Sequence, residues 1–290
     1  MKHLFLLCTL LIVGSFTHFL GAQTRSAAEL HRHYEMQVWH DLIERQQRHT
    51  NDENIDVKFY HLDIEIAIDS SYIRGKVHCH LESVVEGLET LFLDLSQALT
   101  VDSISFPCVS YYQEDDKIQI QLNKTYEPGE IIELTIYYQG SPINPGGYKG
   151  LVYETHHGNE PVIATLSTPY LAHSWYPCKD GPEDKADSVW IDITIDKREV
   201  NGIEMIAVSN GVLEDTVSFG SKKTFKWRHR YPVVTYYVMA AISNYETLTD
   251  TYTNDSGEIM PLEYFAFEES STEIGGIIKI PEVIDRKSVV

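Results

Sequence analysis

The chain has 290 residues, and its 43 acidic residues against 23 basic ones give a formal net charge of −20 at pH 7. A surface this acidic repels phosphate backbones, so we expect no nucleic acid partner, and it favours cationic ligands such as peptide amines. The length is sufficient for one large domain or two small domains with a sizeable core.

Residues 1–22 have the pattern of a secretory signal peptide. A basic start at Lys2 precedes the apolar run Leu4–Val13, and the small residues Gly21 and Ala22 end the segment. A membrane anchor is the rival interpretation, but the apolar run is shorter than the roughly 20 residues of a spanning helix. We therefore expect a secreted or periplasmic protein that contacts no membrane after removal of this segment.

Residues 23–54 are expected to form an N-terminal helical segment. Leu30, Tyr34, Val38 and Leu42 recur at three-to-four spacing among charged residues, which defines one apolar stripe on a helix.

From Val57 the period of the pattern changes to two. Tyr60, Leu62 and Ile64 alternate with polar residues, which predicts a strand with one buried face. Similar strand segments are predicted at residues 73–81, 91–95, 118–122, 132–138, 189–195, 204–208, 224–230, 233–242 and 262–267. Residues 233–242 are apolar on both faces, which favours a central strand. Strands this frequent, with no helices between them, predict an all-β fold with an antiparallel sandwich architecture.

Beyond Cys8, the sequence contains Cys79, Cys108 and Cys178, and it has no C-x-x-C motif. An odd number of cysteines in an exported chain leaves at least one unpaired, so neither a disulfide framework nor a thiolate zinc site is indicated. We expect them to be buried as small hydrophobic residues.

A stretch rich in proline and glycine, residues 140–187, interrupts the strands. Long loops on rigid sheets often carry function. Its second half, Ser167–Asp187, reads STPYLAHSWYPCKDGPEDKAD. This segment resembles the signature loop of the peptidase M1 family of aminopeptidase N-like zinc metallopeptidases, which usually reads Glu/Gln-Pro-x-x-Ala-Arg-x-x-Phe/Trp-Pro-Cys-x-Asp-x-Pro. The loop positions singled out by the resemblance are Pro169, Ala172, His173, Trp175, Tyr176, Pro177, Cys178, Asp180 and Pro182.

Further segments resemble the family's N-terminal domain in the family's order. They are Tyr60-His61-Leu62-Asp63, Leu91–Leu95, Tyr126–Glu130, Ser209-Asn210-Gly211 and Ala240-Ala241-Ile242. The resemblance implies a saddle-like β domain over residues 55–250. It also implies that residues 251–290 are the start of a catalytic domain that is truncated in this chain.

The family's zinc is bound by an H-E-x-x-H helix and a later Glu, and the motif's Glu activates the bound water. No His-Glu dipeptide occurs in this sequence. We therefore expect no catalytic residue and no metal site in the chain as given. Zinc and the peptide substrate are expected to bind only in the missing catalytic domain, and the chain alone is expected to be inactive.

Thr168 stands where the family has a Glu or Gln that binds the substrate's free amino group. Threonine brings no charge, so the amine-binding position is either altered or replaced by a neighbouring acidic residue, or the loop is only scaffold. His173 stands where the family usually has Arg, and we expect it to donate toward a nearby carbonyl or Asp180. The aromatic, Pro and Cys residues of the loop are expected to pack rather than react.

Several histidines have a spacing that could place them together as metal ligands. His78 and His80 project on one strand face, and His33 and His40 share a helix face, but two ligands do not make a zinc site. The sequence therefore favours solvated surface histidines.

The sequence is compatible with two functions. The first is the N-terminal domain of a secreted zinc aminopeptidase that removes N-terminal residues from peptides. The second is a non-catalytic module of the same fold that binds a peptide or protein. An H-E-x-x-H motif in the reading frame beyond Val290 would favour the first.

Overall fold

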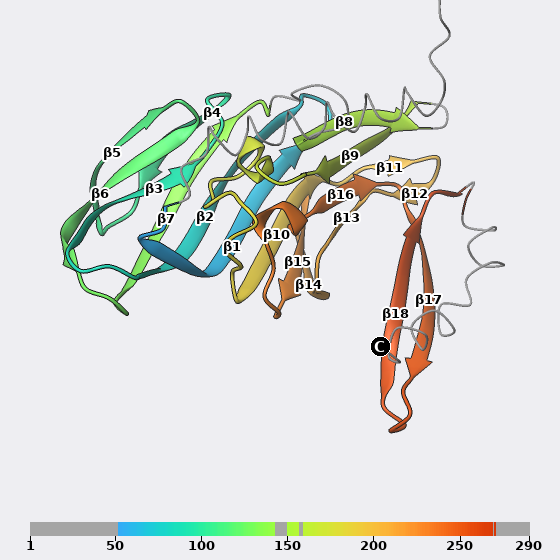
Figure 1. Cartoon of the computed structure of the whole chain (residues 1–290). Coiled ribbons are helices and arrows are strands. Elements are labelled where there is room, and N and C mark those ends of the chain that lie inside the picture. The colour runs from blue at the N-terminus through green and yellow to red at the C-terminus, as the bar shows by residue number, and fades with distance from the viewer. Residues whose placement is uncertain (1–51, 143–149, 157–158, 269, 271–290) are drawn as a thin grey trace, which may run out of the picture. The chain divides into compact units, whose positions relative to one another are not determined.

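The structure is a computed structural model, and it describes residues 52–142, 150–156, 159–268 and 270 (Figure 1). The predicted signal peptide, nearly all of the predicted helix over residues 23–54 and residues 271–290 lie outside the described residues. Within the described residues almost all regular structure is strand, with two single-turn 3-10 helices, η2 (Ala172–Ser174) and η3 (Thr235–Tyr237). No helix in this part of the chain is long and apolar enough to cross a membrane. The predicted all-β fold is confirmed.

A seven-stranded sheet forms the centre of the described fold, in the order β14-β15-β10-β1-β2-β7-β4 (Figure 1). Its strands are β1 (Ile55–Ala67), β2 (Tyr72–Ser83), β4 (Leu99–Ile104), β7 (Ile131–Gly140), β10 (Ser188–Asp196), β14 (Val212–Phe219) and β15 (Lys222–His229). All neighbours are antiparallel except β1 and β10, which run parallel with Leu62 opposite Ile191. The antiparallel prediction therefore misses one pairing, because β10 reaches the sheet through the long 167–187 connection rather than a hairpin.

Four smaller sheets accompany it. A three-stranded sheet has the order β3-β6-β5, and a four-stranded sheet has the order β13-β16-β9-β8. The others are the hairpins β11-β12 and β17-β18. The strands are β3 (Leu88–Asp94), β5 (Cys108–Glu114), β6 (Lys117–Tyr126), β8 (Gly150–His156), β9 (Glu160–Leu166), β11 (Glu199–Val200), β12 (Ile203–Glu204), β13 (Ile206–Ser209), β16 (Ala240–Ser243), β17 (Glu246–Thr253) and β18 (Ile259–Ala266).

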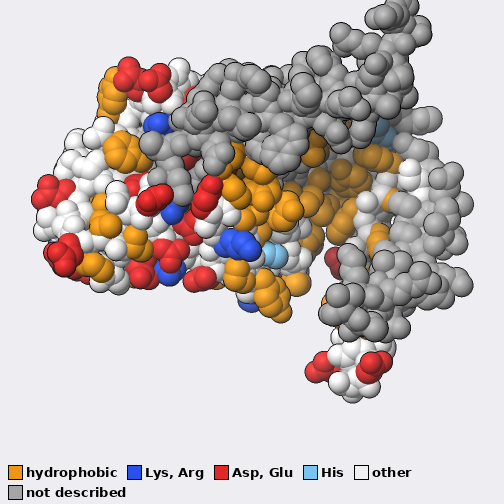
Figure 2. Space-filling model, viewed as in Figure 1, with side chains coloured by type: hydrophobic (Ala, Val, Ile, Leu, Met, Phe, Trp, Pro, Cys, Tyr) orange, Lys and Arg blue, Asp and Glu red, His pale blue; other side chains and the backbone are white. Residues whose placement is uncertain are grey.

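One hydrophobic cluster joins these sheets. On β1 the alternating residues Leu62 and Ile64 are buried, and Val77 of β2 and Leu91 of β3 belong to the same cluster. Burying such a side chain contributes about 1.5–3 kcal/mol, so the period-two pattern specifies which face of each strand turns inward. Asp and Glu side chains gather over the β3-β6-β5 sheet on the face seen in Figure 2.

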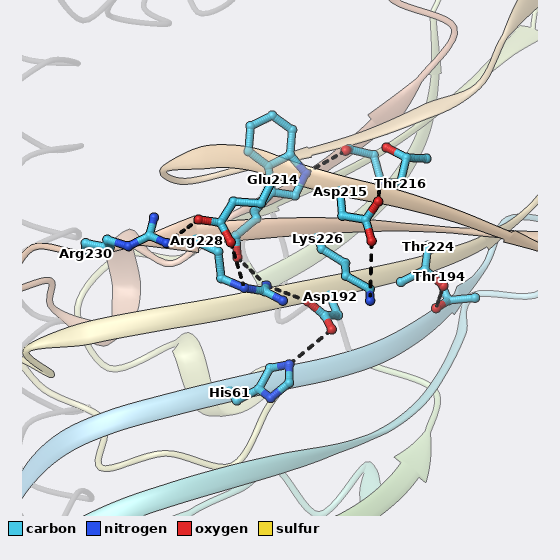
Figure 3. Close-up of polar contacts among 12 residues, drawn as sticks. His61, Asp192, Thr194, Glu214, Asp215, Thr216, Thr224, Lys226, Arg228 and Arg230 are labelled. Atoms are coloured by element: carbon cyan, nitrogen blue, oxygen red, sulfur yellow. Dashed lines mark hydrogen bonds and ion pairs between the residues drawn. The ribbon is translucent and has the colours of Figure 1, made fainter.

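The polar face of the large sheet carries a network that crosses several strands (Figure 3). Asp192 Oδ1 accepts a 2.6 Å hydrogen bond from Arg228, and its Oδ2 lies 3.2 Å from His61 Nε2. Arg228 also lies 3.8 Å from Glu214, which accepts a hydrogen bond from Arg230. Burial alone would raise the pKa of Asp192, but His61 and Arg228 hold it below its usual range. Residues of β1, β10, β14 and β15 are thereby tied together.

Two strand predictions are corrected. The segment 233–242 is not one central strand, because only Ala240–Ser243 pairs in a sheet and Thr235–Tyr237 forms η3. At η3 the chain leaves the extended conformation, and the hydroxyl of Thr235 donates a hydrogen bond to Asp180 of the 167–187 loop at 3.2 Å. The stretch 140–187, predicted as loop, contains β8 and β9, which pair from Gly150 to Leu166. Residue 250, the predicted end of the β domain, lies within β17, and the domain boundary itself stays a prediction.

Gly211 is the position where the fold most plainly requires a glycine. Its φ is +89°, and a Cβ there would lie 2.2 Å from the carbonyl oxygen of Arg228 on the neighbouring strand. Gly87 has a similar φ of +70° but no atom within 4 Å of the same position.

We expect Gly87→Ala to destabilise the protein by about 1–2 kcal/mol, which is the cost of the left-handed conformation alone. Gly211→Ala should lose a further 1–3 kcal/mol or so, because the strand backbone must also move. Urea unfolding of the two variants measures the difference. Equal losses would show that the backbone does not approach Gly211 closely.

Candidate functional site

The Ser167–Asp187 loop connects β9 to β10, and most of it lies inside the protein. Every residue from Tyr170 to Gly181 is buried. The loop is attached to the end of β3 by a bridge between Asp94 and Cys178, in which their backbone groups exchange hydrogen bonds of 2.7 and 3.1 Å. A connection of this length is normally on the surface, where water forms hydrogen bonds with its backbone polar groups. In this protein, other protein groups form hydrogen bonds with the buried loop instead.

The carboxylate of Asp180 is the centre of the loop's polar contacts. Its Oδ2 accepts hydrogen bonds from the backbone N–H of His173 at 3.0 Å and from His173 Nδ1 at 2.8 Å. Its Oδ1 accepts one from the hydroxyl of Thr235 at 3.2 Å. The backbone N–H of Asp180 donates to Asp94 Oδ2 at 3.0 Å. The Asp180 side chain is fully buried, so these hydrogen bonds replace its hydration.

His173 is the basic side chain that faces this buried carboxylate. Burial alone would lower the pKa of His173, but the hydrogen bond and charge of Asp180, with smaller effects of Asp94 and Asp116, raise it above the usual value. The family resemblance places Arg here, and a protonated His supplies the same charge with a shorter side chain. His173 therefore donates to Asp180, as the sequence suggested.

Lys179 attaches the loop to the first strand. Its Nζ donates to the carbonyl of Ile55 at 2.6 Å and to Asp184 Oδ2 at 2.9 Å, and its backbone N–H donates to the Tyr60 hydroxyl at 2.9 Å. Asp184 Oδ2 also accepts from the backbone N–H of Val57 at 3.1 Å. Both members of the Lys179–Asp184 ion pair, which belong to the loop, therefore also hydrogen-bond to the backbone of β1.

Aromatic side chains fill the space beneath the loop. Trp175 and Tyr176 are 1% and 0% exposed. The carbonyl of Trp175 accepts from the Tyr138 hydroxyl at 3.0 Å, and the Tyr176 hydroxyl donates to the carbonyl of Thr235 at 3.0 Å. Burial raises the pKa of the Cys178 thiol well above its ordinary value, so this thiol is inert rather than a nucleophile.

The predicted loop residues therefore divide into two groups. Ala172, His173, Trp175, Tyr176, Pro177, Cys178 and Asp180 are brought together in the buried part. Thr168 and Pro182 are exposed and Pro169 is half-buried, so the residue that the resemblance aligns with the family's amine-binding position lies on the surface at the start of the loop. The role of Thr168 stays a prediction.

A surface hollow of about 680 Å³ lies beside the segment that holds η3. It is lined by Lys185, Asn210, His229, Pro232, Val233, Val234, Tyr236 and Tyr237. Sequence reasoning missed this hollow and the partners Asp94, Thr235 and Asp184. No local motif identifies them, since Asp94 and Thr235 reach the loop only through the fold.

The family pattern described as the peptidase M1 N-terminal domain matches residues 56–237. The chain belongs to this family. Solved structures agree: the M1 zinc metallopeptidase from Deinococcus radiodurans, as a point mutant, aligns with a TM-score of 0.64 at 21% identity over 73% of this chain and 48% of that one. A structure titled two domain M1 zinc metallopeptidase mutant bound to L-tryptophan aligns at 0.63, with 21% identity and the same two coverages.

A third structure, the Deinococcus radiodurans mutant bound to a Tyr-Ser-Ala substrate, aligns with a TM-score of 0.62 at 21% identity over 73% of this chain and 47% of that one. The M1 chain described here thus spans about half the length of these solved structures. No curated protein matches its sequence. At this identity the structural likeness establishes the M1 N-terminal fold.

The pair of His173 and Asp180 generates a pH-dependent prediction. Because the folded-state pKa of His173 is raised above that of the unfolded chain, its contribution is complete below about pH 6.5 and is lost as the pH rises through the folded-state pKa. His173→Asn keeps a neutral donor, so we expect a loss of about 1–3 kcal/mol at pH 6 that shrinks toward pH 9. Urea unfolding across this range measures it.

His229→Asn is the control of opposite sign. Burial lowers the pKa of His229, so its charged form disfavours folding and the effect of this variant should appear only as the pH falls below about 6.5. A His173→Asn effect that is constant from pH 6 to pH 9 would contradict the charged pair.

Proposed function

We propose that this chain is the N-terminal domain of a zinc aminopeptidase that removes N-terminal residues from peptides outside the cytoplasm. Membership of the M1 N-terminal family carries this proposal, together with the exposed Thr168 near the start of the 167–187 loop. The role of the chain is to form one wall of the peptide site, while the zinc is held by a catalytic domain.

The residues of this chain do not fit the catalytic zinc. The family's ligands include an H-E-x-x-H helix, and the sequence has no His-Glu dipeptide. Among the described residues, one group of His and acidic side chains could hold a metal ion, His78, His80 and Glu133, and it lies on strands rather than on a helix. No step of peptide hydrolysis is therefore assigned to these residues.

In this proposal the residues of this chain bind the peptide's amino group and orient the peptide. The Asp180 contacts and the Lys179 ion pair hold the loop against the core. Thr168 is therefore close in sequence to a rigidly held segment. The Thr168 hydroxyl can accept one hydrogen bond from a peptide ammonium group. The strongly acidic chain attracts the same cation over a longer range.

A non-catalytic peptide-binding module is the second candidate. The uncharged Thr168 favours it, because the family's Glu or Gln at this position is what binds the amine. The two candidates predict different sequences downstream of Val290. The enzyme requires an H-E-x-x-H motif within about one further domain length in the same reading frame. A reading frame without that motif would refute the enzyme and leave the binding module.

The purified chain should release no chromogenic group from an aminoacyl substrate, with or without added zinc, because it has no H-E-x-x-H ligand set. Zinc-dependent release by the chain alone would refute the proposal that the catalytic zinc is held by a separate domain.

In an enzyme that joins this chain to its catalytic domain, Thr168→Glu should lower KM for free-amine substrates by about tenfold. The reason is a new charge-assisted hydrogen bond, worth roughly 1.5–3 kcal/mol where water is excluded. N-acetylated substrates, which have no ammonium group, should gain nothing.

Leu166→Glu is the matched control, since it adds the same charge at a neighbouring exposed position of β9. If Thr168→Glu and Leu166→Glu act alike, or if free and acetylated substrates respond equally, Thr168 is not at the amine position.

A further inference from the structure

The outward face of β2 carries two histidines whose rings meet. Val77, Cys79 and Leu81 are fully buried on the other face of the strand, so His78 and His80 both point outward and are half-buried. Their Nε2 atoms lie 3.0 Å apart, and the two rings are nearly perpendicular at 86°. At this distance the two rings share a hydrogen bond, which a metal ion bound by both Nε2 atoms would replace.

The neighbouring strand supplies a carboxylate at the same place. The register between β2 and β7 puts Glu133 directly opposite His80 and Thr135 directly opposite His78. The ligand atoms of His78, His80 and Glu133 all lie within 4.8 Å of one another. Glu133 is therefore a third potential metal ligand. The sequence alone did not reveal it, because Glu133 lies on β7 and reaches His80 only through strand pairing.

The nitrogen separation fits a shared metal ion. Two nitrogens bound to zinc at about 2.0–2.1 Å lie roughly 2.9–3.4 Å apart when the angle at the metal is between about 90° and 109°. The observed Nε2 to Nε2 distance of 3.0 Å is already in this range. Glu133 is exposed, so a change of side-chain rotamer brings its carboxylate to the ion at little cost.

Both imidazole rings are held in place by neighbours. His78 Nδ1 lies 3.0 Å from the hydroxyl of Thr135, so an Nδ1–H that donates to Thr135 leaves the Nε2 lone pair directed at His80 and the proposed ion. The position of Thr135 is itself fixed, because its backbone N–H donates to the Ser105 hydroxyl at 2.8 Å. The His80 ring packs on Phe59 with centroids 5.0 Å apart. Metal-ligating histidines characteristically have such supporting contacts.

We propose that His78, His80 and Glu133 bind a divalent first-row transition-metal ion such as Zn²⁺, with water completing the coordination. Two imidazoles and one carboxylate suit this class of ion, and Cu²⁺ should bind more tightly than Zn²⁺. The site joins β2 to β7 and is independent of the zinc proposed for the catalytic domain. It forms only when both strands are paired, so binding stabilises the folded chain.

The test is titration of the full chain with Zn²⁺ by calorimetry after treatment with a chelator, together with thermal unfolding with and without the ion. We expect one Zn²⁺ per chain and a rise in Tm of several degrees. His78→Gln and His80→Gln should each weaken Zn²⁺ binding by at least about tenfold and remove the rise in Tm. Thr135→Val, which removes only the supporting hydroxyl, should weaken binding by about tenfold.

Matched controls separate this site from other histidines. His229→Gln and the double variant His33→Gln/His40→Gln should bind Zn²⁺ as the unaltered chain does. Glu133→Gln changes an exposed side chain, so it tests the site even if a histidine variant fails to fold. Zinc binding that persists unchanged in His80→Gln and Glu133→Gln, or that is lost in His33→Gln/His40→Gln, or no binding at all, would overturn the proposal.

Discussion

The buried carboxylate of Asp180 is the constraint on which the arrangement of the loop depends. It accepts three hydrogen bonds, from the backbone and ring of His173 and from the hydroxyl of Thr235. A buried charge is stable only when it is paired and hydrogen-bonded, so the loop and the η3 segment must fold around this residue together. The same carboxylate thus contacts both the loop and the η3 segment, where the predicted strand over residues 233–242 is broken.

The same constraint explains how a long connection becomes a rigid part of the domain. Lys179 and Asp184, which form an ion pair, also hydrogen-bond to the backbone of Ile55 and Val57 on β1. The backbone bridge between Cys178 and Asp94 attaches the loop to the end of β3. Three segments far apart in the sequence thus hold one loop, and only its ends are at the surface. Such support would place the proposed amine-binding residue accurately, because a residue on a rigid base is held more precisely than one on a free loop.

The sequence predicted the parts of the fold that have a local signature. The alternation along β1 and β2 identified both strands and their buried faces, since the period of two is a direct result of strand geometry. The segment 233–242 was predicted wrongly because an apolar run gives no information about which neighbour it will pair with. The loop motif identified Asp180 and His173, but Thr235 could not be found, because its contact with Asp180 is made only by the fold. Glu133 was missed for the same reason, since strand register decides what lies opposite His80.

Hydrogen exchange of the loop tests the central role of Asp180 most directly. We expect the amides of residues 171–180 to be as well protected as those of β1. Asp180→Asn should speed their exchange by at least about tenfold while the β5-β6 hairpin is unchanged. Exchange in residues 171–180 that is fast in the unaltered protein, or that does not respond to Asp180→Asn, would show that Asp180 does not hold the loop in place.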